Sequence, residues 1–288
     1  MKFGITGCSH SAGAFNDSKF NTSIDRNAGW VGQLANIYPE HDFILFAKEG
    51  TGSTHQEAVL NYFISEQVDV AILQLTDSRV SIGQNYYRNP AEIYERPVPL
   101  SHVEYASSEF ILQSKTKNLR VCDYDRFWQL CCSVEYTDYI TNFKKHYPSR
   151  PHWMFFRDSY KNFDLYNNPC FQKYTLESKM LQDNFNYWMM MLDWYDSRFK
   201  HFFVLDWCAD YYNFTKFKKI ARRDWKESVL DFFIRQLQDR NNLTRNQSLA
   251  VANRLMEAYG GHLNADQQSD MLTHHILRNP RLLSLLDS

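Results

Sequence analysis

A short turn near the N-terminus gathers several side chains that can take part in chemistry. Residues 3–6 form an apolar run that predicts a β-strand, and Gly-Cys-Ser-His-Ser-Ala-Gly follows directly at residues 7–13. A serine hydroxyl at such a position attacks an acyl carbon when a base takes its proton and backbone N–H groups bind the oxyanion. One interpretation of the turn is therefore that Ser9 is a nucleophile. The other is that Ser9 and Ser11 cap a loop, and the local motif alone favours this second interpretation.

The elements that would position this turn alternate regularly over the first eighty residues. Apolar runs at 42–47 and 68–76 predict two further strands that are buried on both faces. Helical spacing at 29–39 and a capping-box pattern at the start of 52–67 predict two helices between the strands. Strands that alternate with helices through short connections indicate a parallel sheet with right-handed crossovers.

Each of these three strands is followed by small and polar residues. Lys-Glu-Gly-Thr-Gly-Ser-Thr at 48–54 follows the second strand, and Gln-Leu-Thr-Asp-Ser-Arg at 74–79 ends the third. The carboxyl ends of parallel strands meet at one edge of a sheet, where ligands bind. Neither a Walker A motif nor a dinucleotide-binding glycine motif is present, so nucleotide binding is not favoured.

The remainder of the chain is rich in predicted helices. We predict a helical insertion or lid over about 100–199, which is long and aromatic, and a strand at 201–207 that returns to the sheet. Further helices are expected near 215–222, 225–239, 245–258 and 265–277. The sequence therefore predicts one α/β domain spanning residues 1–288, with its core in 1–80 and 200–278.

Composition excludes several classes of protein. Lys plus Arg number 32 and Asp plus Glu number 33, a balance that argues against a general nucleic-acid binder. The longest apolar stretches are far shorter than the ~20 residues of a membrane span, and the sequence begins without the apolar segment of a signal peptide. Six cysteines without a CxxC pair indicate a reduced protein. We therefore predict a cytoplasmic protein without nucleic-acid or membrane partners.

A histidine near the other end of the chain changes the interpretation of the first turn. His262 stands in the glycine-bordered loop Gly-Gly-His-Leu-Asn, just before a predicted helix. Asn264 can cap that helix, with Gln267 three residues later. A histidine just outside a helix N-terminus is exposed to functional contact, although most single histidines of this kind belong to ordinary surface loops.

Together, the serine turn, the glycine turn after the second strand, the third strand and the His-Leu-Asn-Ala-Asp-Gln-Gln loop resemble the SGNH/GDSL hydrolase family, over roughly residues 1–80 and 255–278. The chain also resembles SGNH-like proteins found in phage genomes, which would place it in the host cytoplasm or in a virion. The resemblance implies a three-layer α/β/α fold of flavodoxin-like type. It also implies that Ser9 is the nucleophile, that His262 is the general base, and that backbone N–H groups of Ser9 and of Gly50 or Gly52 bind the oxyanion.

The sequence departs from the family pattern at three places. Cys8 stands where the family usually has an aspartate, and residues 73–79 lack the Gly-x-Asn-Asp block whose asparagine donates to the oxyanion. Gln74, Thr76 or Asp77 would take that place. Tyr259 occupies the position of the usual acid, three residues before His262. The orienting role would then pass to Asp206, Asp210, Glu257 or a backbone carbonyl.

Two functions from different classes follow from these residues. The first is a serine esterase or acyl hydrolase that acts on a small ester or an O-acetylated carbohydrate, without metal or cofactor; acyl transfer to another alcohol is a variant of it. The second is a catalytically inactive SGNH-like protein that serves as a binding or virion-associated module. His274 and His275 are adjacent on a predicted helix and point in different directions, which argues against a metal site.

Overall fold

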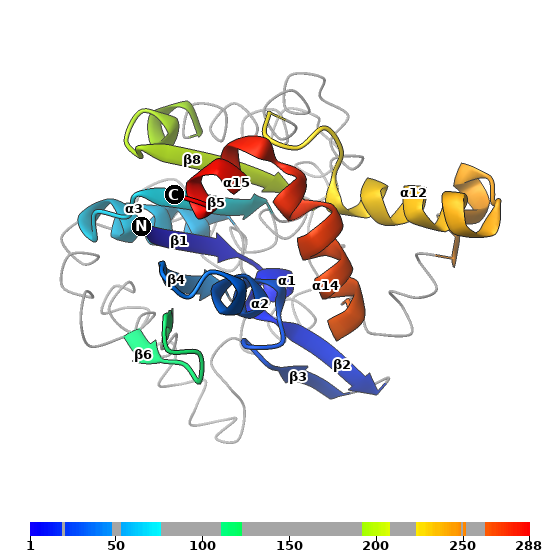
Figure 1. Cartoon of the computed structure of the whole chain (residues 1–288), viewed down its shortest axis with the longest axis horizontal. Coiled ribbons are helices and arrows are strands. Elements are labelled where there is room, and N and C mark those ends of the chain that lie inside the picture. The colour runs from blue at the N-terminus through cyan, green and yellow to red at the C-terminus, as the bar shows by residue number, and fades with distance from the viewer. Residues whose placement is uncertain are drawn as a thin grey trace, which may run out of the picture.

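The structure is a computed structural model, and it describes residues 1–18, 21–47, 53–75, 111–122, 192–207, 223–248, 250–251 and 263–288 (Figure 1). The strands within these ranges are β1 (Lys2–Gly7), β2 (Ala14–Ser18), β3 (Asn21–Ile24), β4 (Asp42–Ala47), β5 (Val70–Leu75), β6 (Ile111–Gln113), β7 (Leu119–Cys122) and β8 (His201–Asp206). The helices are α1 (Ser9–Ala12), α2 (Trp30–Ile37), α3 (Ser53–Ser65), α12 (Val229–Asn241), α14 (Ala265–His274), the 3-10 helix η2 (Ile276–Arg278) and α15 (Pro280–Leu286).

Six of the strands form one sheet in the order β6-β7-β4-β1-β5-β8 (Figure 1). Strand β1 pairs in parallel with β4 and β5, and these pair in parallel with β7 and β8. Strand β6 runs antiparallel to β7, while β2 and β3 form a separate hairpin. The protein is therefore a mixed α/β structure built on a mostly parallel sheet, and the α/β class predicted from the alternating pattern is confirmed.

The central strands are buried on both faces, which explains their uninterrupted apolar runs. Along β1, Phe3 and Ile5 belong to a core cluster that also contains α2, α14 and α15. Gly4 lies between them and faces α3, where a Cβ atom would come within 2.7 Å of the Phe63 ring. The absence of a side chain at Gly4 thus lets α3 close against the sheet.

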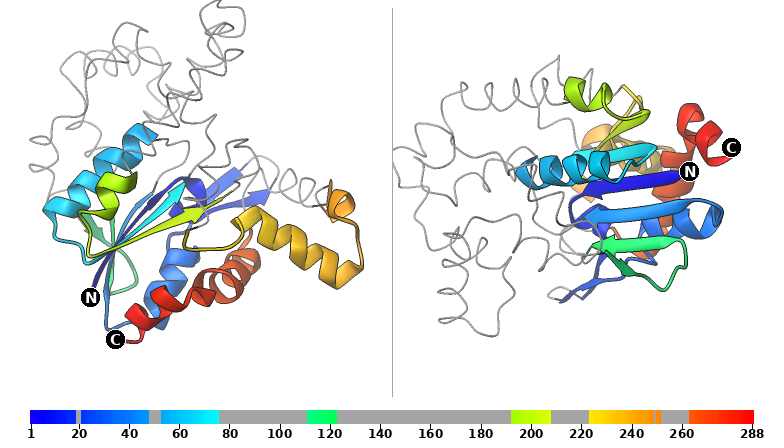
Figure 2. Two further views of the ribbon diagram at one scale, coloured as in Figure 1. Left: turned by 90° about the horizontal axis from the view of Figure 1, so that it is seen from above. Right: turned by 90° about the vertical axis from the view of Figure 1, so that its left-hand side faces the viewer.

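Helices cover both faces of the sheet. Figure 2 shows α3 on one face and α2, α14 and α15 on the other. Trp30 and Leu34 of α2, Met271 of α14 and Leu282 of α15 are buried in the same core cluster. Packing between segments from the two ends of the sequence therefore holds the sheet from this side.

Residues 111–122 belong to the sheet, although they fall within the range 100–199 that we assigned to a helical insertion. They form β6 and β7, and Leu119 pairs with Phe43 of β4. Asn118 secures the hairpin, because its side-chain N–H groups donate to the carbonyls of Ala35, Tyr38 and His41. Strands of three and four residues are too short for their periodicity to reveal them. Elsewhere in 100–199, only residues 192–199 are described.

Within the described ranges, none of the helices combines the length and the hydropathy that a bilayer-spanning segment requires.

Candidate functional site

The turn that was predicted to carry the nucleophile lies at the carboxyl edge of the sheet, beside the central strand β1 (Figure 1). Strand β1 stands between β4 and β5, so the chain crosses over β1 on its way from β4 to β5. The chain thus first adds a strand on one side of β1 and then continues on the other side. The place where the strand order reverses in this way is a topological switch point, where open α/β sheets bind their ligands. The turn at residues 8–13 therefore occupies the position in the fold that is most suited to a site.

Ser9 is the first residue of α1, a single helical turn. Cys8 precedes it in an extended conformation, and the Cys8 carbonyl accepts hydrogen bonds from the N–H groups of Ser11 at 3.1 Å and Ala12 at 3.0 Å. Gly13 ends the turn in the left-handed region at φ 74°, which glycine adopts without a Cβ clash. Ser9 itself is half-buried, so its side chain keeps some exposure at this edge of the sheet.

Gln74 of β5 ties the turn to the neighbouring strand. Its side-chain carbonyl accepts a hydrogen bond from the Ser11 hydroxyl at 2.6 Å, and its amide donates to the Cys8 sulfur at 3.3 Å. The Gln74 main-chain carbonyl accepts from the side chain of Gln56 on α3 at 2.8 Å. Gln74 and Ser11 are both fully buried. This clamp fixes the residues on both sides of Ser9 against β5.

The thiol of Cys8 is a poor nucleophile in this setting. Burial raises its pKa, and hydrogen bonds from the His10 main chain, from Gln74 and from Ser9 offset part of that increase. A thiol with a raised pKa stays protonated at neutral pH, whereas the thiolate is the reactive form. Of the two adjacent residues, Ser9 is therefore the better candidate for nucleophilic chemistry.

His10 joins the turn to the end of β8. Its ring stacks on the indole of Trp207, with the ring centroids 3.4 Å apart and the planes inclined by 16°. Trp207 follows β8 directly, and its main-chain carbonyl accepts from the N–H of Leu230 at 3.0 Å. Sequence reasoning missed this contact. The available signal was an aromatic residue placed immediately after a predicted strand.

Asp206, the weak candidate for an orienting acid, is buried at the end of β8 and lies opposite Leu75 of β5. Successive side chains of a strand point to opposite faces. Trp207 belongs to the core cluster that contains α2, and Asp206 therefore points to the face that α3 covers. The two residues after Leu205 thus serve opposite sides of the sheet.

The helix that follows His262 is anchored close to the turn. Helix α14 begins with the predicted capping box, in which the Asn264 side chain accepts from Gln267 N–H and the Gln267 side chain accepts from Asn264 N–H, both at 2.9 Å. One turn later the buried Gln268 accepts from the N–H of Trp30 at 2.9 Å. A Cβ atom on the neighbouring Gly29 would lie 2.7 Å from Cα of Gly13. Helix α14 thus packs beside the end of α1.

The structure describes three of the predicted site residues, Ser9, Gln74 and Asp206, and it places Gln74 close to the turn that carries Ser9. Gln74 contacts the residues on either side of Ser9, while Asp206 lies on the next strand. Among the described side chains, no group of three or more His, Cys, Asp or Glu residues is arranged to hold a metal ion. The other predicted residues lie outside the described ranges: Gly50, Gly52, Thr76, Asp77, Asp210, Glu257 and His262.

The clamp makes a prediction about stability. Replacing Gln74 with methionine keeps the size of the side chain but removes the acceptor of the buried Ser11 hydroxyl. We expect the free energy of unfolding to fall by about 1–3 kcal/mol, the cost of leaving a buried hydroxyl unpaired. Urea denaturation measures it. The double variant Gln74→Met/Ser11→Ala should lose less than the sum of the single variants, because both partners are then absent. A Gln74→Met protein as stable as the wild type would contradict the clamp.

Comparisons of the chain with protein-family models, with curated proteins and with solved structures give no match.

Proposed function

We propose that this chain is a serine esterase or related acyl hydrolase of SGNH type, with Ser9 as the nucleophile and His262 as the general base. The observation that carries the proposal is the position of Ser9. It is a partly exposed serine at the start of the helical turn after the central strand, at the switch point of the sheet. An acyl group bound at this edge would meet the hydroxyl and the backbone of a rigid turn.

The topology supports the finer part of the proposal, a three-layer fold of flavodoxin-like type. Numbered by their order in the chain, the parallel strands β7-β4-β1-β5-β8 run 4-2-1-3-5, and their central part, 2-1-3, is the one found in flavodoxin-like sheets. Helices lie on both faces of this sheet (Figure 2). In sheets with this 2-1-3 centre, ligands bind where the first and third strands end, and here those strands are β1 and β5.

In the proposed reaction, the Ser9 hydroxyl oxygen attacks the carbonyl carbon of an ester while His262 takes the hydroxyl proton. The tetrahedral intermediate collapses to an acyl-enzyme, and His262 returns the proton to the leaving alcohol. Water then attacks the acyl-enzyme, with its proton passing through His262 back to Ser9, and the carboxylic acid departs.

The oxyanion needs donors that are already oriented before the reaction. We assign one to the Ser9 backbone N–H, which lies at the start of α1, and a second to Gly50 or Gly52. Gln74 and Thr76 are the candidates for a third, whereas Asp77 would donate only in its protonated form, because an ionised carboxylate repels the oxyanion. The Gln74 amide has a second N–H group besides the one that donates to the Cys8 sulfur, but the side chain is fully buried, so a ligand would reach this group only after the turn moves. Asp206 stays a weak candidate for the acid that orients His262, because it points to the face that α3 covers, whereas α14, the helix after His262, packs on the opposite face.

The substrate in this proposal is a small ester or an O-acetylated carbohydrate, the class that the family resemblance suggests. The second candidate function is a catalytically inactive binding module with the same fold. It is favoured by one observation, namely that Gln74 already contacts the turn through both ends of its amide. In that case the carboxyl edge would bind a ligand without converting it.

Hydrolysis of p-nitrophenyl acetate by the full chain tests the choice between the two functions. The esterase account predicts that turnover increases as the pH is raised past about 6.5, the ordinary pKa of histidine, because the base must lose its proton to be active. The His262→Gln variant should lose roughly 10³-fold or more of this activity. The exposed His274 gives a matched control, because His274→Gln should hydrolyse the ester like the wild type. A folded protein without turnover, or full activity in His262→Gln, would contradict the proposal.

A further inference from the structure

Strand β8 is the last strand at its end of the sheet, within the part of the chain that the structure describes. On its inner side it pairs with β5 along its whole length, from His201 to Asp206. The main-chain groups of alternate residues in a parallel strand point to opposite sides. His201 donates to Asp69 on the inner side, so the main-chain groups of Phe202 and Val204 point outward. Outward groups of this kind are what an added strand would pair with.

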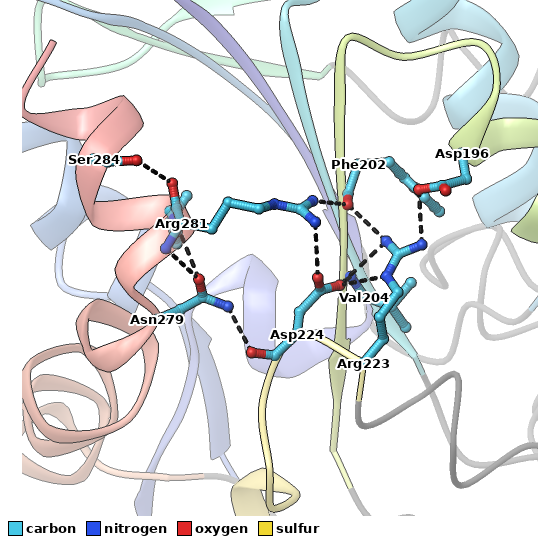
Figure 3. A network of polar contacts seen from close by, with 9 residues as sticks. Asp196, Phe202, Val204, Arg223, Asp224, Asn279, Arg281 and Ser284 are labelled. Carbon is cyan, nitrogen blue, oxygen red and sulfur yellow. Dashed lines mark hydrogen bonds and ion pairs between the residues drawn. The ribbon is translucent and has the colours of Figure 1, made fainter.

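Side chains, and not a further strand, form hydrogen bonds with these outward main-chain groups (Figure 3). The Val204 N–H donates to the carboxylate of Asp224 at 2.8 Å. The Phe202 carbonyl accepts from the guanidinium groups of both Arg223, at 2.7 Å, and Arg281, at 2.6 Å. Asp224 thus takes the part of a strand carbonyl, and the two arginines take the part of strand N–H groups.

The three side chains hold one another in this arrangement. The Asp224 carboxylate is nearly buried, and it lies 3.2 Å from Nη2 of Arg223 and 3.5 Å from Nη1 of Arg281. Each guanidinium also covers a ring of the strand. The Arg281 group stands 4.1 Å from the ring centroid of Phe203, and the Arg223 group stands 5.8 Å from that of Phe202. Because these rings belong to adjacent residues, the two arginines close on β8 from its two faces.

Further contacts anchor the arrangement at both ends (Figure 3). Arg223 donates to Asp196 at 2.7 Å, in the segment before β8. On the other side, the Asn279 side chain donates to the Asp224 main-chain carbonyl at 2.6 Å and caps α15 by accepting from the Arg281 and Leu282 N–H groups. Elements on both sides of the strand therefore fix the positions of the charged groups.

The sequence of β8 gives a reason for such protection. His-Phe-Phe-Val-Leu-Asp has high β propensity and no proline, the composition of segments that pair with copies of themselves. The other end of the sheet is protected differently, because β6 is only three residues long. Strand β8 has six residues, so a short length does not protect it in the same way.

We propose that Arg223, Asp224 and Arg281 form a side-chain closure of the β8 edge, and that this closure prevents β8 from pairing with β8 of a second copy of the chain. The carboxylate of Asp224 is its central group, since it both accepts from Val204 and holds the two arginines.

Sedimentation velocity over a range of protein concentrations tests the proposal. The Asp224→Ala variant should self-associate at least about tenfold more tightly than the wild type, since the outward Val204 N–H becomes available. The matched control is Glu227→Ala, which breaks the exposed ion pair with Arg235 and leaves the edge intact. It should sediment like the wild type. A folded Asp224→Ala protein whose association stays within twofold of the wild type would overturn the proposal.

Two further measurements keep the test decisive. Adding Val204→Pro to Asp224→Ala removes the outward N–H and should return association to the wild-type level; association that persists means that another surface causes it and overturns the proposal. Hydrogen exchange of the wild type covers the case in which Asp224→Ala does not fold. The Val204 amide should then exchange at least about 100-fold more slowly than an unprotected amide, because Asp224 binds it. Exchange at the unprotected rate would overturn the closure.

Discussion

The Ser9→Ala variant is expected to lose roughly 10³-fold or more of the ester hydrolysis of the wild type. The substitution removes the oxygen that would form the acyl-enzyme and keeps the backbone N–H that would bind the oxyanion. Ser9 is half-buried and lies in the first position of a helical turn, where alanine is readily accepted. Stability should therefore change by less than about 0.5 kcal/mol.

Initial rates with p-nitrophenyl acetate measure this effect, and thermal unfolding confirms that the variant is folded. Ser65 provides the matched control. It is an exposed serine on α3 whose hydroxyl donates to the Tyr62 carbonyl, away from the carboxyl edge. The Ser65→Ala variant should retain the wild-type rate. If Ser9→Ala hydrolyses the ester within twofold of the wild type, the nucleophile is another residue.

The second large effect concerns the stability of the fold in acid. His275 lies at the end of α14, buried between the rings of Phe232 at 5.2 Å and Trp225 at 6.3 Å. Its Nε2 atom has no hydrogen-bond partner within the described part of the chain. Burial lowers the pKa of His275 from 6.5 to about 4, and Arg235 adds to the decrease while Glu227 opposes it. The folded protein therefore holds this imidazole in its neutral form.

The direction of the pH effect follows from the two protonation states. Above pH 6.5 the imidazole is neutral in both the folded and the unfolded chain, and its full contribution to stability is present. As the pH falls from 6.5 to about 4, the unfolded chain takes up a proton that the folded protein does not. The free energy of unfolding should decrease by about 3 kcal/mol over this interval, since each pKa unit corresponds to about 1.4 kcal/mol.

The His275→Phe variant isolates this contribution, because it keeps an aromatic ring in the cluster and removes the titration. Urea denaturation at pH 7.5 and pH 4.5 should show a smaller loss of stability in His275→Phe than in the wild type. The neighbouring His274 is exposed, so His274→Gln should keep the wild-type pH dependence. An equal loss in His275→Phe and the wild type would mean that other groups cause the acid sensitivity.

The sequence predicted the central part of the sheet well, because its elements carry strong local signals. The run at 42–47 coincides with β4, and the helix expected over 52–67 corresponds to α3. The central strands are buried on both faces, so each appears in the sequence as a continuous apolar stretch. Such a stretch can be recognised without knowledge of the tertiary structure. The capping box at Asn264 was equally local, since all of its contacts lie within four residues.

The contacts that build the candidate site were not predictable in the same way. Ser11 and Gln74 are 63 positions apart, and nothing near either residue indicates their hydrogen bond. The stacking of His10 on Trp207 depends on β8 pairing with β5, which determines where the end of β8 lies. Side chains that meet across a sheet edge depend on strand order and register. Local patterns do not encode these.

The most direct test of the central claim, that Ser9 is an activated nucleophile, is to locate the adduct of a fluorophosphonate probe. The full native chain is treated with the probe and digested with trypsin, and tandem mass spectrometry identifies the modified residue. Cleavage after Lys2 and Lys19 yields one peptide that contains Ser9 together with Ser11 and Ser18, which fragment ions distinguish. We predict a single adduct on Ser9 that is lost when the protein is unfolded in urea. A folded chain that carries no adduct, or carries it on another residue, would contradict the account.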